Sequence, residues 1–504
     1  MTSMTSLMSI ISSPAHASVI QVPAGQPTLK AAIAAAVSGD EIVVADGVYT
    51  GADNRALDFG GKNLFLHSAN GPAACIIDCE LAARGFEFQS GETAAAIVEG
   101  FTIRHGKPAA GTLSGGAIFI HGAGMTTGPT VRHCTFEANT AGAGGAIAAA
   151  DSANPTVVDC TFVANAATSS VGNSGGGGIQ LNGAGVAMTI EKCTFEANTA
   201  PSGGGVYSAG SSLPTINGCT FIKNTATSYA GAISLSGPSV ATVWNCRFFG
   251  NNGPSYGGAI AIVGTGANPS IVNCVFSGNS VKPPIGLGGA VMIQLGSAQI
   301  LNCTMVGNAA GGPSFGSAIA KLSNVSCNVQ NCVLWGNAGA PILDSGTNPI
   351  VVAYSIVQGG FAGAGNSGAD PLIVDADGPD NMVGTPDDDL RVSAGSPAID
   401  SGSNPAWNVA LTTDVAGNLR FYDDPAVPDG GAGTAPIIDR GAYESQPAAP
   451  TCDLADLDCD GDVDGGDLGL LLGAWGSNNP DADLDGDGLV GGGDLGIMLG
   501  AWTG

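Results

Sequence analysis

Apolar positions recur through the middle of the chain with a spacing of 26 to 33 residues. Eight cysteines mark the repeat: Cys134, Cys160, Cys193, Cys219, Cys246, Cys274, Cys303 and Cys332. A β-branched residue lies three positions before each cysteine and a bulky apolar residue two positions after it, a spacing that fits short strands rather than helices. An asparagine follows each cysteine by five positions: Asn139, Asn165, Asn198, Asn224, Asn251, Asn279, Asn308 and Asn337.

This pattern predicts an all-β fold, a parallel β-solenoid. Each repeat holds two or three short strands and a corner of small residues, such as Gly144-Gly145. One repeat cannot bury its own apolar face, so the repeats must stack with strands about 4.8 Å apart. Cysteine and phenylalanine then form interior columns, and asparagine, whose amide can bond to the next rung, forms a column at a turn. A leucine-rich repeat has a similar period but needs a leucine frame that is absent here.

Residues 18–47 predict a cap over the first rung. Thr28 can N-cap an apolar helix over residues 29–37, which Gly39-Asp40 ends, and a strand over residues 41–45 follows. Such a helix shields the unpaired edge of the first rung.

The cysteines of the column are expected to be buried thiols rather than disulfides, because stacked side chains point in parallel and their Cβ atoms are too far apart. The better disulfide candidates lie outside this column. They are the pairs Cys75 with Cys79 and Cys452 with Cys459.

Longer stretches resemble a known family. The stretches GDEIVVADGVYTG and VEGFTIRHG and the CTFxxN…GGAI units resemble bacterial exported right-handed parallel β-helix proteins of the pectate-lyase-like superfamily. The resemblance implies a right-handed β-helix over residues 18–343, with the repeats at 98–343. Residues 344–446, whose later part resembles a C-terminal segment common on such surface proteins, form an acidic continuation. The fold hosts lyases, hydrolases, adhesins and inert spikes, so it implies no activity.

The charge of the chain is −27, from 15 basic and 42 acidic residues. This excess argues against nucleic acids and anionic membranes as partners. No stretch reaches the ~18 apolar residues of a membrane-spanning helix, so membrane insertion is not expected. Residues 1–17 are interpreted as a signal peptide, because a short apolar stretch precedes Ala15-His16-Ala17. We therefore expect an extracellular or cell-surface protein.

The last fifty residues carry the strongest chemical signal, an acidic loop that occurs twice, 27 residues apart. Alternating aspartates, a glycine at position 6 and an aspartate at position 12 predict two calcium loops, because calcium prefers six to eight oxygen ligands. The predicted ligands, including the position-7 carbonyls of Asp462 and Leu489, are Asp456, Asp458, Asp460, Asp462, Asp467, Asp483, Asp485, Asp487, Leu489 and Asp494. An apolar stretch that predicts a short helix follows each loop.

A duplicated loop and helix with aspartate at position 12 resembles the type I dockerin. The resemblance implies a small α-helical calcium-binding domain over residues 452–504, after a linker at 447–451. It also implies docking to a cohesin-like or cell-surface partner. Positions 10 and 11, where dockerins carry partner-contacting residues, are glycines in both loops.

No pair of carboxylates identifies an active site in the repeats. Residues 197–343 contain no aspartate or glutamate, and Glu137 and Glu196 are expected two rungs apart on the solvated face. Three histidines and two arginines fall near the first rungs but have no paired carboxylate in the sequence pattern, so they are interpreted as surface residues. They are His105, His121, His133, Arg104 and Arg132.

One bulky column could bind a ligand. Tyr229, Tyr256 and Phe315 occupy equivalent places beside the glycine corners, where the rings could stack on sugar rings or pack under the turns. We expect a non-catalytic solenoid that acts as a rigid or glycan-binding scaffold docked through its tail. The alternative is a polysaccharide lyase or glycoside hydrolase delivered by its dockerin.

Overall fold

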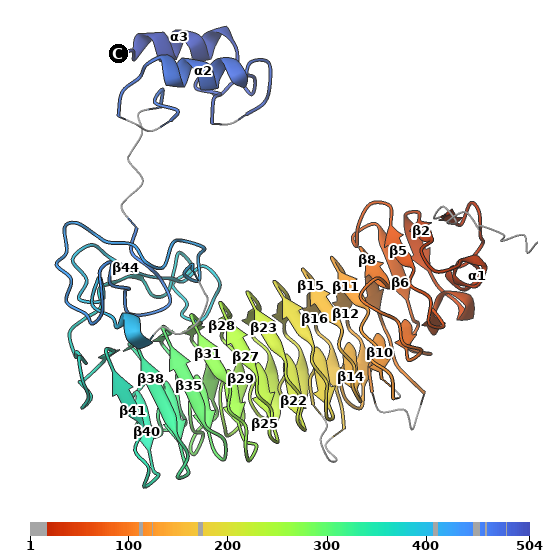
Figure 1. Ribbon diagram of the computed structural model, residues 1–504, viewed down its shortest axis with the longest axis horizontal. Coiled ribbons are helices and arrows are strands. Elements are labelled where there is room, and N and C mark those ends of the chain that lie inside the picture. Colours follow the sequence, from red (N-terminus) through yellow and green to blue (C-terminus); the bar gives the residue numbers. More distant parts are fainter. Residues whose placement is uncertain are drawn as a thin grey trace, which may run out of the picture. The chain divides into compact units, whose positions relative to one another are not determined.

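The computed structural model describes residues 18–109, 114–122, 124–169, 175–406, 412–446, 454–458, 461–479 and 481–503. The chain divides into two compact units. The first comprises residues 1–423 and 427–444, and the second comprises 445–504 with 424–426. The first unit is a parallel β-helix whose rungs stack along its axis (Figure 1).

Three parallel sheets run along this unit, and a fourth parallel sheet of six strands accompanies its middle rungs. Sheet A contains β1 (Val19–Val22), β2 (Glu41–Val44), β5 (Phe65–Ser68), β8 (Ile97–Glu99), β11 (Thr130–Arg132), β15 (Thr156–Val158), β19 (Thr189–Glu191), β23 (Thr215–Asn217), β27 (Thr242–Trp244), β31 (Ser270–Val272), β35 (Ala298–Leu301), β38 (Cys327–Gln330) and β41 (Val351–Ala353). Sheet B contains β3 (Gly47–Tyr49), β6 (Cys75–Asp78), β9 (Thr102–Arg104), β12 (Thr135–Glu137), β16 (Thr161–Val163), β20 (Thr194–Glu196), β24 (Thr220–Ile222), β28 (Arg247–Phe249), β32 (Val275–Ser277), β36 (Thr304–Val306), β39 (Val333–Trp335) and β42 (Ile356–Val357).

The other two sheets complete each rung. Sheet C contains β4 (Leu57–Asp58), β7 (Phe86–Phe88), β10 (Ile118–His121), β14 (Ile147–Ala150), β18 (Ile179–Asn182), β22 (Val206–Ala209), β26 (Ile233–Leu235), β30 (Ile260–Ile262), β34 (Val291–Ile293), β37 (Ile319–Lys321) and β40 (Ile342–Asp344). Sheet D contains β13 (Thr140–Ala141), β17 (Ala166–Ala167), β21 (Thr199–Ser202), β25 (Thr225–Tyr229), β29 (Asn252–Gly253) and β33 (Ser280–Val281). A complete rung therefore has up to four strands, one more than the repeat pattern predicts.

The interior columns follow the predicted repeat. The strands of sheet B pair in register, so that Phe136, Phe162, Phe195, Phe221, Phe248 and Phe276 stack with ring centroids 4.6–4.9 Å apart. All eight repeat cysteines are buried and free. Burial raises the pKa of thiols such as Cys160 and Cys219, which keeps them neutral and unreactive.

The disulfide expectation for Cys75 and Cys79 is wrong. Both thiols are free and buried. Cys75 begins the extended strand β6 and Cys79 follows its last residue, so their Cα atoms lie roughly 13 Å apart, beyond the reach of a disulfide. The pairing of β6 with β9 and of β9 with β12 places Cys75 in the column of Cys134, which the sequence pattern missed. Cys452 and Cys459 lie outside the described residues.

Each column thiol has a backbone carbonyl within reach. Cys246 Sγ lies 3.0 Å from the oxygen of Trp244 and 3.6 Å from that of Ile216. Because a serine hydroxyl would find the same acceptors, Cys246→Ser should cost only about 1 kcal/mol in unfolding free energy, less than an unsatisfied hydroxyl would cost. Cys246→Val, which adds a methyl group to a full interior, should cost as much or more. Denaturant unfolding of both variants measures this, and a loss above 3 kcal/mol for serine would contradict the carbonyl contacts.

The asparagine column is a continuous buried ladder. Asn224, for example, donates Nδ2 to the oxygen of Phe195 at 2.8 Å and to Oδ1 of Asn251 at 3.0 Å, and the same Oδ1 accepts the backbone N–H of Asn224. The inter-rung bond was predicted, but the turn also contains a residue in the left-handed conformation, which the asparagine itself does not adopt. That conformation belongs to the residue before each asparagine, such as Lys223 with φ 51°. The column requires asparagine because its side-chain amide makes these hydrogen bonds between rungs.

The N-terminal cap has the predicted elements. Thr28 accepts a hydrogen bond from the N–H of Ala31 and begins helix α1 (Leu29–Ala35), which ends two residues earlier than predicted. Helix α1 lies at the end of the solenoid, against β1, β4 and the short 3-10 helix η1 (Ala52–Asn54) (Figure 1). Leu29 and Ile33 extend the apolar interior. The described part of the cap therefore covers the first rung as expected.

The solenoid sheets continue beyond residue 343 through β40, β41 and β42. Residues 358–406, 412–423 and 427–444, here called the lobe, then turn back along the solenoid. The lobe contains the antiparallel strands β43 (Ile373–Asp375) and β44 (Asp389–Val392) and the 3-10 helix η2 (Asn404–Ala406). Leu390, Val415 and Ala442 pack on the outer side of sheet B against Phe249, Val275 and Val306.

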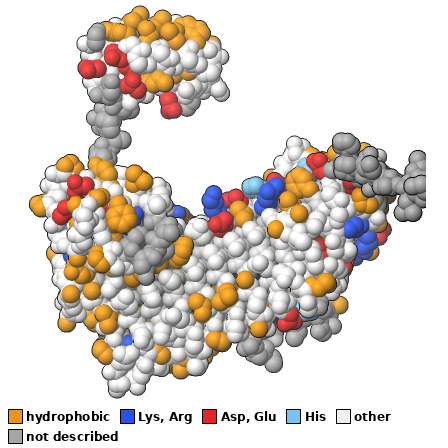
Figure 2. Space-filling view, in the orientation of Figure 1, with side chains coloured by type: hydrophobic (Ala, Val, Ile, Leu, Met, Phe, Trp, Pro, Cys, Tyr) orange, Lys and Arg blue, Asp and Glu red, His pale blue; other side chains and the backbone are white. Residues whose placement is uncertain are grey.

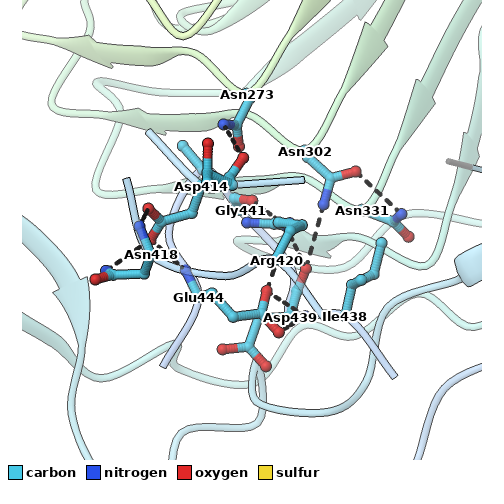
Figure 3. Close-up of polar contacts among 12 residues, drawn as sticks. Asn273, Asn302, Asn331, Asp414, Asn418, Arg420, Ile438, Asp439, Gly441 and Glu444 are labelled. Atoms are coloured by element: carbon cyan, nitrogen blue, oxygen red, sulfur yellow. Dashed lines mark hydrogen bonds and ion pairs between the residues drawn. The ribbon is translucent and has the colours of Figure 1, made fainter. Parts of the chain in front are cut away.

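Asparagines at the turns between sheets A and B hold the lobe (Figure 3). Asn302 Nδ2 donates to the oxygen of Asp439, and Asn331 donates to that of Ser403. Inside the lobe, Arg420 is fully buried and its guanidinium lies 3.4 Å from the Glu444 carboxylate. Burial raises the pKa of Glu444 to about 9, although Arg420 opposes the shift. The lobe is therefore an integral part of the β-helix unit, and it contains its own buried ion pair, Arg420 with Glu444.

Candidate functional site

The C-terminal unit is an internal duplication. Its two helices, α2 (Gly465–Gly473) and α3 (Gly492–Gly500), follow the two acidic loops and pack against each other. Its buried residues come in pairs 27 positions apart: Ala455 with Ala482, Val463 with Val490, and Leu471 with Met498. This small apolar core gives the unit two equivalent halves.

The two loops bring together the same carboxylates. Side-chain oxygens of Asp456, Asp458 and Asp467 lie within 4.8 Å of one another, and those of Asp483, Asp485 and Asp494 do the same. These are positions 1, 3 and 12 of each predicted loop. The structure therefore assembles six of the ten predicted ligands into two matched groups.

The other predicted ligands lie outside these two carboxylate groups or outside the described residues. Asp462, Asp487 and Leu489 are exposed and do not belong to these groups, and Asp487 accepts the N–H of Leu489 at 2.9 Å. The carbonyls of Asp462 and Leu489 were predicted as ligands, not their side chains. Asp460 lies outside the described residues.

The position-12 aspartates join each helix to its loop. Asp467 Oδ1 accepts the N–H groups of Leu457 at 2.6 Å and Asp458 at 3.1 Å, and Oδ2 accepts that of Asp464. Burial alone would raise the pKa of Asp467, but these N–H donors lower it overall. For Asp494, the N–H of Gly491 is the main cause that lowers the pKa. Both carboxylates are therefore held in the charged form that a cation requires.

The donor set fits a hard divalent cation. All the gathered groups are carboxylates, and the loop glycines Gly461 and Gly488 have φ of 97° and 90°, which other residues rarely adopt. Residues 452–504 contain twelve aspartates and no basic residue, so a bound cation would relieve strong repulsion. Each helix also has four glycines among nine residues, too many for a stable isolated helix.

Both helices, together with the turn that follows each of them, leave apolar side chains exposed at equivalent positions. The exposed pairs are Leu470 with Ile497, Leu472 with Leu499, and Trp475 with Trp502. Figure 2 shows hydrophobic side chains gathered on the helix side of this unit and acidic ones nearer the loops. An apolar face of this kind on a small unit is typical of a protein-binding surface.

The predicted aromatic column lies on the β-helix as expected. Tyr229 and Tyr256 are half-buried on adjacent rungs, with ring centroids 5.6 Å apart at 16°. Each ring therefore covers one face of the other, which leaves outer faces, edges and hydroxyls for a ligand. Neither hydroxyl has a partner among the residues that the structure describes. Phe315 is half-buried two rungs beyond Tyr256, with Leu287 between them.

The basic residues near the first rungs have carboxylate partners, contrary to the sequence interpretation. Asp78 contacts Arg104 at 2.9 Å and His105 at 3.1 Å. Glu99 contacts Arg132 at 2.7 Å and His133 at 3.3 Å. These pairs follow from the strand register, because β6 and β9 pair so that Asp78 lies opposite Arg104. Alignment of these two strands in the sequence could have revealed the pair.

The three histidines do not form one centre. His121 ends a strand of sheet C and contacts Asp151 at 2.8 Å, whereas His105 and His133 occupy different turns beside sheet B. Glu137 and Glu196 are exposed on sheet B with Val163 between them, two rungs apart as predicted. A further group that no motif marked, Asp400, Asp423 and Asp429, gathers in the first unit.

Comparison with known proteins agrees with this architecture. The protein-family model described as the right-handed β-helix region matches residues 45–230 and 169–356 of the sequence. The fold defines a parallel β-helix protein, and the match shows that the chain belongs to the right-handed β-helix family. A search among curated proteins finds no match.

Three solved structures are similar to this chain at low identity. Pectate lyase Pel9A is 15% identical, with a TM-score of 0.37 over 83% of this chain and 91% of that chain. The catalytic domain of an alpha-1,3-glucanase is 11% identical, with a TM-score of 0.31 over 68% and 69%. A pectin methylesterase in complex with a hexasaccharide is 11% identical, with a TM-score of 0.23 over 71% and 91%.

Proposed function

We propose that this protein is an exported β-helix scaffold that binds glycans and docks to a partner through a calcium-ordered C-terminal unit. The observation that carries the proposal is the duplication of that unit. Two loops of the same spacing gather the same three carboxylates, and each is followed by a helix with the same exposed apolar positions.

Calcium is the proposed cofactor because hard oxygen donors and flexible loop geometry suit it. Asp456, Asp458 and Asp467 would hold one ion, and Asp483, Asp485 and Asp494 the other. The ions would supply the positive charge that the acidic loops lack, and their binding would stabilise the glycine-rich helices. In the proposal, calcium therefore controls whether the apolar face is presented.

The proposed partner of this face is a cohesin-like or cell-surface protein. The matched pairs Leu470 with Ile497 and Trp475 with Trp502 offer the aromatic and aliphatic anchors that protein interfaces use. Because positions 10 and 11 are glycines, the partner would contact apolar side chains of the helices rather than loop side chains. Removal of calcium should abolish this docking.

An extracellular or cell-surface location is proposed together with docking. The interpretation of residues 1–17 as a signal peptide supports it, although these residues lie outside the described ones. In the described part of the chain, no helix is long and apolar enough to cross a membrane.

The aromatic column is the proposed glycan-binding surface of the solenoid. Tyr229→Ala and Tyr256→Ala should each weaken binding of an extended polysaccharide while costing about 1 kcal/mol of stability, because the rings are half-exposed and gain mainly from each other. Glycan-array binding and thermal unfolding measure the two effects. If the rings serve only as packing, both variants should instead lose several kcal/mol and leave glycan binding unchanged.

A second candidate is a glycoside hydrolase. Glu137 and Glu196 lie on one exposed face two rungs apart, or about 9.6 Å, near the upper limit for the carboxyl pair of an inverting enzyme. Incubation with polysaccharides should distinguish the candidates. Reducing-end products that disappear in Glu137→Gln would favour the hydrolase over the scaffold.

A further inference from the structure

The outer side of sheet B ends in a half-exposed tryptophan. Phe249, Ser277, Val306 and Trp335 lie opposite one another on successive rungs. The lobe seals the first three, which are at most 3% exposed, but Trp335 remains only partly buried. The sealed face therefore opens at this indole.

A pocket of about 390 Å³ lies there, between the last rungs and the lobe. Trp335 and Val306 line it from the solenoid, and Leu372, Ile373 and Val383 line it from the lobe. A Cβ atom at Gly307 would lie 2.3 Å from Val383 Cγ1, so the glycine is needed for the lobe to approach this closely. Both walls belong to the same compact unit.

One carboxylate lies at the rim of the pocket. Asp370 Oδ1 accepts the N–H of Leu372 at 2.9 Å, which fixes the side chain. Its Oδ2 has no hydrogen-bond partner among the described residues. Asp370 is also the only ionisable side chain in the described lining, so the pocket combines apolar walls and an indole with one fixed acceptor.

We propose that this pocket binds a ring of a neutral carbohydrate. The C–H face of a pyranose can pack on the Trp335 indole while a sugar hydroxyl donates to Asp370 Oδ2, a charge-assisted hydrogen bond. The volume is at the lower end of the range for small-molecule sites, about 300–1,000 Å³, and suits one or two rings.

Charge selects the class of sugar. Residues 344–451 carry 15 acidic and 3 basic side chains, and a uronic acid carboxylate would face Asp370 directly. Like charges at this distance repel, so an acidic polysaccharide should bind less well than its uncharged counterpart. This inference needs neither the Tyr229–Tyr256 column nor the calcium loops, and it holds or fails separately from the proposed function.

The test measures binding of oligosaccharides to the full chain by titration calorimetry. The probes are cellohexaose, mannohexaose, hexagalacturonate and fully methyl-esterified hexagalacturonate, of which the last two differ in charge. At least one neutral probe should bind, and the ester should bind better than the acid. Trp335→Ala should weaken binding about tenfold or more, whereas Trp335→Phe should stay within about threefold.

Two further variants complete the design. Asp370→Asn should reduce the difference in affinity between hexagalacturonate and its methyl ester, because it removes the charge that repels the acid. Leu213→Ala changes an exposed apolar residue outside the pocket lining and should leave this binding unchanged. Equal affinity of the parent protein and Trp335→Ala for every probe, or stronger binding of the free acid, would overturn the proposal. Thermal unfolding of Trp335→Phe and Asp370→Asn verifies that the variants are folded.

Discussion

Asn251→Ala is expected to destabilise the β-helix by about 3–6 kcal/mol, because the change leaves several buried polar groups without partners. Asn251 Oδ1 accepts both the N–H and the Nδ2 of Asn224, and its own Nδ2 donates to the oxygen of Phe221. All three residues are fully buried, so water cannot replace these bonds without opening the rung. Chemical denaturation measured by circular dichroism gives the free energy.

The adjacent residue provides a matched control. Asn252 is half-exposed in sheet D and bonds to Ser280 Oγ at 2.9 Å. Asn252→Ala removes the same atoms one position away and should cost less than about 1 kcal/mol. Equal losses for the two variants would contradict a special role for the interior ladder.

Asp344→Ala should cost about 3–5 kcal/mol, because it leaves a buried lysine without its counter-charge. Lys321 is fully buried at the end of sheet C, where Nζ lies 2.8 Å from Asp344 Oδ1 and donates to the oxygens of Ser323 and Asn348. Denaturant unfolding would measure the loss. The double variant Lys321→Met with Asp344→Ala removes both charges and should recover most of it, whereas no recovery would mean that the ion pair is not the cause.

The same pair predicts acid sensitivity. Burial alone would raise the pKa of Asp344, but Lys321 and backbone N–H donors lower it overall. Because the folded pKa lies below the unfolded value, the stabilisation is complete above the ordinary aspartate range and is lost as the pH falls through the folded pKa. The double variant Lys321→Met with Asp344→Ala should therefore lack this loss of folding stability at low pH.

The solenoid could be predicted from the sequence because its rungs obey one local rule. Cysteine, phenylalanine and asparagine recur at fixed offsets, and stacking is the only way such short units bury them. The cap was predictable from Thr28 in the same way. The early rungs were harder to predict, because Phe101 occupies the position that is cysteine in the later rungs. The repeat therefore could not be traced back to Cys75, and the pairing of Asp78 with Arg104 on neighbouring strands was missed as well.

The lobe could not be predicted from the repeat. Its contacts join residues more than a hundred positions apart, such as Asn302 with Asp439 and Thr304 with Ala442, and the lobe itself has no period. The pocket at Trp335 exists only because the lobe returns to sheet B. By contrast, the carboxylate groups of the two acidic loops are local, and the spacing of the aspartates was sufficient to predict that they gather.

The most direct test of the central proposal is calcium titration of the metal-free full-length chain by calorimetry, compared with Asp456→Ala, Asp483→Ala and the control Asp481→Ala. Asp481 is exposed in the same unit but lies outside both gathered groups. The proposal predicts that each loop variant binds one calcium ion fewer than the parent, that the double loop variant binds two fewer, and that Asp481→Ala matches the parent. Unchanged binding in the double variant, or no calcium binding by the parent at millimolar concentration, would contradict the calcium-ordered docking unit.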